Sequence, residues 1–114
     1  MEDPVKMAEG GDAIVVLITA GSREEADRIA RRLVEDRLAA CVNIVPQVRS
    51  LFIWEQKLSQ GDEVLLVVKS RRARFEQLAA VVKRLHSYSV PEIIALPIVA
   101  GAADYLQWVS ESTP

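Results

Sequence analysis

The sequence is poor in the residues that build metal and redox sites. Its 114 residues include one cysteine, Cys41, and one histidine, His86. A lone cysteine cannot form a disulfide within the chain, and it excludes a multi-cysteine metal site in a single subunit. One imidazole and one thiol give no independent signal of a Ser-His-Asp or Cys-His nucleophile. Thiolate–metal chemistry would therefore need ligands from elsewhere.

Long hydrophobic runs and an excess of one charge are also missing. No apolar stretch approaches the length that spans a bilayer, and the acidic, polar start of the sequence is unlike a signal peptide. The formal net charge is -2, without the basic footprint that binding to a phosphate backbone requires. We therefore expect a cytoplasmic protein that binds neither membranes nor nucleic acid.

What the sequence does contain is typical of one folded domain. Half of the residues are hydrophobic and 26% are charged, as in ordinary globular proteins. This length allows one hydrophobic core but not two ordinary domains. Residues 1–11 carry Pro4, Gly10 and Gly11 among charges without a clear period, which predicts a flexible tail. We expect a single domain over residues 12–114.

Apolar runs predict four strands. Residues 14–18 and 64–68 are continuous apolar runs, the pattern of strands covered on both faces. Residues 40–55 predict a long strand that bends at Pro46, because proline cannot donate to a ladder. This strand is expected to pair with residues 64–68 through a connection of about six to eight residues. Residues 92–97 supply the fourth strand.

Capping and periodicity predict three helices. Ser22 lies three residues before Glu25, the capping-box spacing, and an apolar stripe follows. Ser70 is expected to cap a second helix of similar pattern. The spacing of Tyr105 and Trp108 indicates a short C-terminal helix that packs an aromatic face.

The resulting order, βαββαβ plus a tail helix, predicts the fold class α/β (α+β) with a ferredoxin-like topology. In that topology both main helices cover one face of a four-stranded antiparallel sheet. The two central strands nevertheless carry apolar side chains on both faces, so the face without helices would expose large side chains to water. We therefore expect the chain to assemble with copies of itself.

Three residues are candidate metal ligands, and no residue is a candidate catalyst. His86 ends the second helix, where it is either a cationic imidazole stabilised by the helix dipole or a metal ligand, with Glu92 nearby along the chain. Cys41 lies in a strand, where it is either a buried hydrophobic residue or a soft-metal ligand. Trp54 and Tyr88, at the ends of elements, are either packing anchors or parts of a ligand pocket.

Four segments resemble the CutA family in order and spacing over nearly the whole chain after Gly11. They are residues 38–44 (LAACVNI), 54–57 (WEQK), 88–97 (YSVPEIIALP) and 104–108 (DYLQW). The resemblance implies a ferredoxin-like fold and a homotrimer built through long strands and hairpins. It also implies a non-catalytic role in tolerance to copper and other divalent cations, with Cu(II) or another divalent cation as ligand and no required cofactor. Where copper-binding members carry a cysteine and a second histidine, this chain has Ile18 and Leu85.

Two alternative functions use the same topology. A trimeric signalling protein of the PII kind would bind a small anionic ligand between subunits, but it needs a basic, glycine-rich loop, and residues 56–61 carry only Lys57 and one glycine. An acylphosphatase-like enzyme would use residues 21–23 as an anion loop, although the capping box at Ser22 already explains that turn. The resemblance favours the trimeric binding protein.

Overall fold

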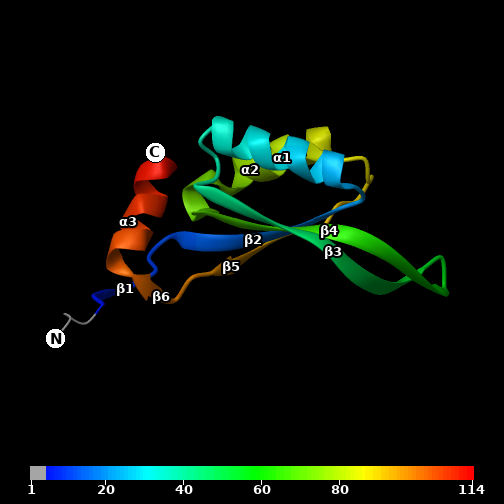
Figure 1. The fold of residues 1–114 in the computed structure, drawn as a ribbon, viewed down its shortest axis with the longest axis horizontal. Helices are drawn as coiled ribbons and strands as arrows, with labels where there is room; N and C mark the ends of the chain where they lie inside the picture. The colour runs from blue at the N-terminus through cyan, green and yellow to red at the C-terminus, as the bar shows by residue number, and fades with distance from the viewer. Residues whose placement is uncertain (1–4) are drawn as a thin grey trace.

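The computed structural model describes residues 5–114. The elements follow in the order β1 (Met7–Glu9), β2 (Ala13–Ala20), α1 (Arg23–Glu35), β3 (Cys41–Trp54), β4 (Lys57–Arg71), α2 (Phe75–Leu85), β5 (Ile93–Pro97), β6 (Ala100–Ala102) and α3 (Ala103–Ser112), with a 3-10 turn at Arg72–Arg74. The main sheet is antiparallel, with strand order β3-β4-β2-β5, and α1 and α2 lie together on one of its faces (Figure 1). The expected ferredoxin-like arrangement is confirmed. None of the helices described is long and apolar enough to cross a membrane.

The core lies between this sheet and the two helices. Alternate residues of each central strand point at the helices, because side chains along a strand alternate between faces. In β2 these are Ile14, Val16 and Ile18, all almost fully buried. They pack in one cluster with the apolar stripes of the helices, including Leu33 of α1 and Leu78 of α2. The two helical stripes predicted from the sequence therefore do cover the sheet.

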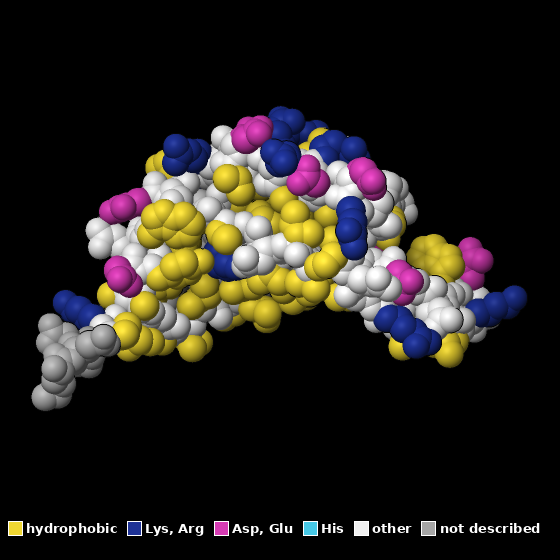
Figure 2. Space-filling model, in the orientation of Figure 1, with side chains coloured by type: hydrophobic (Ala, Val, Ile, Leu, Met, Phe, Trp, Pro, Cys, Tyr) yellow, Lys and Arg dark blue, Asp and Glu magenta, His cyan; other side chains and the backbone are white. Residues whose placement is uncertain are grey.

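The opposite face of the sheet is apolar, and none of the described helices lies over it. Leu17 of β2 pairs directly with Val67 of β4 and with Ile94 of β5, so these three side chains share that face. Ile94 and Leu96 are about half exposed, at 49% and 50%. Figure 2 shows the resulting band of hydrophobic side chains along the lower side of the molecule, away from the helices. The bare apolar face expected from the sequence is present.

The strands β3 and β4 form a long hairpin that projects beyond the rest of the sheet (Figure 1). Trp54 pairs with Lys57, so the turn consists only of Glu55 and Gln56, both at positive φ (51° and 67°). Positive φ at both central residues is the geometry of a type I′ turn. The predicted six- to eight-residue connection was wrong, since residues 57–63, polar except for Leu58, extend β4 and pair with β3.

The expected bend at Pro46 is confirmed as a shift of register. The pairing of β3 with β4 is interrupted between Val45 and Val48. Proline has no N–H to donate at this point, and an irregularity in the ladder accommodates it.

Two local predictions were wrong because the chain uses distant partners. Ser70 does not cap α2: it lies buried in β4, where its hydroxyl donates to the Leu38 carbonyl at 2.6 Å, and α2 starts at Phe75 without a side-chain cap. Residues 7–9, expected in a tail, form β1 and pair with β6, more than ninety positions away. Residues 1–4 of that expected tail lie outside the described part.

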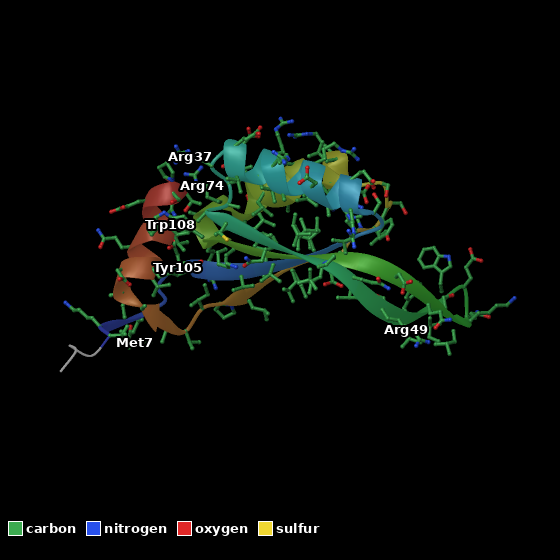
Figure 3. All side chains as sticks on the ribbon, in the orientation of Figure 1. Met7, Arg37, Arg49, Arg74, Tyr105 and Trp108 are labelled. Carbon is green, nitrogen blue, oxygen red and sulfur yellow. The ribbon has the colours of Figure 1, made fainter. Side chains whose placement is uncertain are left out.

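The C-terminal helix exists, but its aromatic face is not its buried face. Tyr105 and Trp108 pack at a tilt, 5.6 Å between ring centroids, and remain 41% and 45% exposed on the side of α3 that faces the rest of the molecule (Figure 3). Val109 is the fully buried apolar residue of α3, and the helix contacts β1, β2 and β4.

We therefore expect Val109→Ala to destabilise the protein more than Trp108→Ala. Removing the buried valine methyl groups should lower the free energy of unfolding by roughly 2 kcal/mol, because it leaves a cavity. Trp108→Ala should cost less than about 1 kcal/mol, since half of the ring is already in water. Urea denaturation of both variants measures the difference. A larger loss for Trp108→Ala would show that the ring carries the packing of α3.

Candidate functional site

A buried carboxylate joins the β2–α1 turn to the segment that follows α2. Ser22 accepts a hydrogen bond from the Glu25 N–H at 3.1 Å, so the predicted cap is confirmed. The Glu25 side chain in turn accepts from the N–H of Gly21 at 3.2 Å and from the N–H of Ser87 at 2.8 Å. Glu25 is only 5% exposed. It therefore fixes the start of residues 87–92 against the first turn of α1.

The pKa of Glu25 reflects both burial and these bonds. Burial alone raises the pKa of a carboxyl group, but the hydrogen bonds from Ser87 and Gly21 outweigh it, so the pKa of Glu25 lies below its ordinary value. Glu25 is therefore ionised at neutral pH. A buried negative charge stands directly behind residues 87–92.

Both ring nitrogens of His86 are engaged with the backbone. Nε2 lies 2.7 Å from the carbonyl oxygen of Thr19, and Nδ1 accepts from the N–H of Tyr88 at 3.0 Å. Because a carbonyl can only accept, these partners assign a neutral imidazole protonated at Nε2. His86 is 8% exposed. To bind a metal ion, this candidate ligand would have to give up one of these two bonds.

Tyr88 connects the same segment to the base of the hairpin. Its ring packs on His86 at 4.6 Å between centroids, and its hydroxyl donates to Glu63 of β4 at 3.0 Å. Burial and the Glu63 carboxylate raise the pKa of Tyr88 to about 12. A side chain at position 21 would meet the Tyr88 ring, since a Cβ there would lie 3.2 Å from the hydroxyl. Gly21, Tyr88 and Glu63 therefore fit together closely.

These contacts form one wall of a cleft of about 600 Å³ between the hairpin and residues 88–92. Its lining contains aromatic rings (Phe52, Trp54, Tyr88), carboxylates (Glu63, Glu92), hydroxyls (Thr19, Ser50, Ser89) and the apolar Leu51 and Val90. No lysine or arginine belongs to this lining. The cleft therefore favours cations over anions.

The structure brings only part of the predicted metal set together. Glu92 lines the cleft. His86 does not line it, but accepts a hydrogen bond from Tyr88, which does. Cys41, half-buried in β3, pairs with Lys69 of β4. Thr19, which lines the cleft, pairs with Leu65, four residues from Lys69 along β4. Four residues of strand span about 13 Å, so Cys41 lies apart from the cleft. Within residues 5–114, no group of three or more His, Cys, Asp or Glu side chains is placed to hold a metal ion.

Glu63 is the site residue that sequence reasoning missed. It directly precedes the apolar run at residues 64–68, where it resembles an ordinary polar end of a strand. Only the close approach of Tyr88 gives it a role. A hydrogen bond between residues 25 positions apart has no local signature.

Comparison with known proteins gives consistent matches. A family model described as "CutA1 divalent ion tolerance protein" matches residues 14–112. The "Divalent-cation tolerance protein CutA" of Thermus thermophilus is 52% identical over 99 residues, covering 87% of this chain and 96% of the relative. "Protein CutA, chloroplastic" of Arabidopsis thaliana is 45% identical over 101 residues, covering 89% of this chain but 56% of the longer relative. The solved structure of the periplasmic divalent cation tolerance protein CutA from Archaeoglobus fulgidus has a TM-score of 0.87 at 43% identity, covering 90% of this chain and 99% of that one.

The lowered pKa of Glu25 predicts a pH-dependent loss in Glu25→Gln. A carboxyl whose folded pKa lies below its unfolded value, about 4.3, stabilises the protein above that value and loses this contribution as the pH falls through the folded pKa. We expect Glu25→Gln to lower the free energy of unfolding by about 1–3 kcal/mol at neutral pH and by much less near pH 3. Urea denaturation at both pH values, with Glu24→Gln as an exposed control, measures this. A difference that does not change with pH would contradict the role of the charge.

Proposed function

The chain belongs to the CutA1 divalent ion tolerance family, and from that membership we propose a trimeric, non-catalytic protein that binds copper and other divalent cations. The observation that supports cation binding most directly is the cleft beside Tyr88, which contains Glu63 and Glu92 and no basic side chain. The same lining argues against a small anionic ligand of the PII kind.

The ligand set supports weak rather than tight metal binding. Divalent cations prefer several oxygen or nitrogen ligands, and one chain contributes two carboxylates in this cleft. Water or a neighbouring subunit would complete the coordination. His86 joins the set only if Nδ1 releases the Tyr88 N–H. Cys41 would form a separate soft-metal site that needs ligands from another chain.

Two features support assembly into a homotrimer. The apolar face that contains Leu17, Val67 and Ile94 is not covered by any element of residues 5–114. The hairpin also exposes large side chains, with Ile53 at 68% and Leu58 at 72%. A neighbouring chain can bury both surfaces and pair with the edge strands β3 and β5. The preference for three subunits rests on the family resemblance.

The location of the protein stays a prediction. The sequence favours the cytoplasm, where Cys41 would remain reduced. The names of relatives include a chloroplastic protein and a periplasmic one, so family membership alone does not assign a compartment.

The first test concerns assembly. Light scattering after size exclusion should return three times the 12.6 kDa chain mass for the natural protein. Ile94→Glu should shift the particle to lower mass, because it places a charge on the uncovered face. Val34→Glu is the matched control, since Val34 is 40% exposed on α1, on the helix side. A monodisperse monomer for the natural protein would refute the trimer.

The second test concerns the metal ion. In calorimetric titrations with Cu(II) and Zn(II), Glu92→Gln and Glu63→Gln should each weaken binding by about tenfold or more, because each removes a charged ligand. Glu76→Gln, on the exposed surface of α2, should change nothing. His86→Ala decides the part of the imidazole: an isotherm equal to that of the natural protein would remove His86 from the ligand set. Unchanged binding in both cleft variants would place the metal elsewhere.

A further inference from the structure

We propose that the cleft between the β3–β4 hairpin and residues 88–92 also binds a small organic ammonium ion, a site that contains Trp54, Tyr88, Glu63 and Glu92. This inference rests on the proposed function in one respect, that the cleft accepts cations. It goes further by naming a different chemical class from a bare metal ion. The reasons are the walls of the cleft, its charge and the small number of metal ligands that one chain places in it.

The walls suit alkylated nitrogen. Trp54 and Tyr88 line the cleft with Phe52 beside them, and Trp54 is 60% exposed in the single chain. The negative faces of aromatic rings attract an ammonium group, and tryptophan attracts it most strongly. Leu51 and Val90 add apolar surface for the carbon atoms attached to the nitrogen. A bare metal ion gains nothing from such surface.

The charge of the cleft is of the required sign. Glu63 and Glu92 are in the lining, and the ionised Glu25 lies directly behind Ser87. The Tyr88 hydroxyl stays protonated because its pKa is raised to about 12, so its ring keeps the neutral form. Arg49 extends from the same hairpin (Figure 3), but its guanidinium donates to Gln60 and is not part of the lining. The cleft therefore has negative charge without an internal counter-ion.

The coordination chemistry also separates the two kinds of cation. A divalent metal needs more directed ligands than the two carboxylates provide, and no group of three His, Cys, Asp or Glu within residues 5–114 is placed to supply them. The charge of a monovalent ammonium ion is spread over several atoms, and the ion needs only nearby negative charge and a contact surface. The cleft of one chain offers both. The cleft volume of about 600 Å³ admits a molecule larger than a hydrated metal ion.

The experiment compares a quaternary ammonium ion with an uncharged molecule of the same shape. Choline chloride is titrated into the natural assembly while NMR follows the indole N–H of Trp54 and the amides of residues 88–92. The carbon isostere dimethylbutanol and sodium chloride at equal ionic strength are titrated in parallel. We expect saturable shifts, confined to the cleft, with choline only. Equal shifts with the isostere, shifts elsewhere, or no saturable shift at millimolar choline would overturn the proposal.

Variants give a second, independent readout. Glu63→Gln keeps an acceptor for the Tyr88 hydroxyl while removing the charge, and Trp54→Leu removes the aromatic face while keeping apolar bulk. Each substitution should weaken choline binding by roughly tenfold. For Trp54→Leu, which lacks the indole N–H, binding is followed on the amides of residues 88–92. Glu76→Gln should have no effect, and unchanged binding in both cleft variants would refute the site.

Titrating Zn(II) into the same samples separates the two proposals. Zinc binding without choline binding would refute the ammonium site and leave the metal function standing. Choline binding without zinc binding would refute the metal function and leave the ammonium site standing. The absence of both would contradict the shared premise that the cleft accepts cations.

Discussion

The Glu25 carboxylate accepts hydrogen bonds from Gly21 in its own turn and from Ser87, 62 residues further along the chain. Without this charge two backbone N–H groups would lose their partners in a partly buried place, at a cost of about 1–3 kcal/mol each. Ser87 is followed by Tyr88, whose hydroxyl reaches Glu63 on β4. The geometry of the cleft therefore depends on one buried charge that does not line it.

Local patterns in the sequence predicted the parts of the fold that depend on local physics. Two apolar runs became the central strands β2 and β4, and Ser22 with Glu25 began α1 as the capping-box spacing predicts. The turn at Glu55 and Gln56 was missed because neither residue is typical of positive φ. The role of Ser70 was missed for another reason: its acceptor, the Leu38 carbonyl, lies 32 residues away.

The candidate site was predictable only in part for the same reason. Glu92 was recognised from its sequence neighbourhood and does line the cleft. The single histidine attracted attention because of its chemistry, but the structure uses both of its nitrogens to hold the backbone at Thr19 and Tyr88. Glu63 had no distinguishing signal in the sequence. Sites assembled from a strand, a hairpin and a loop depend on tertiary contacts that periodicity does not encode.

The projecting hairpin divides the molecule into two regions that differ in how much core they contain. The body of the fold has a core between the sheet and two helices, whereas the end of the hairpin around Glu55 and Gln56 consists of two strands with exposed side chains and no core of its own. Two-stranded ribbons alone are marginally stable in water, and regions with few buried contacts open locally at low free energy. In the proposed trimer a neighbouring chain covers this ribbon, so hydrogen exchange of its amides would slow as protein concentration rises.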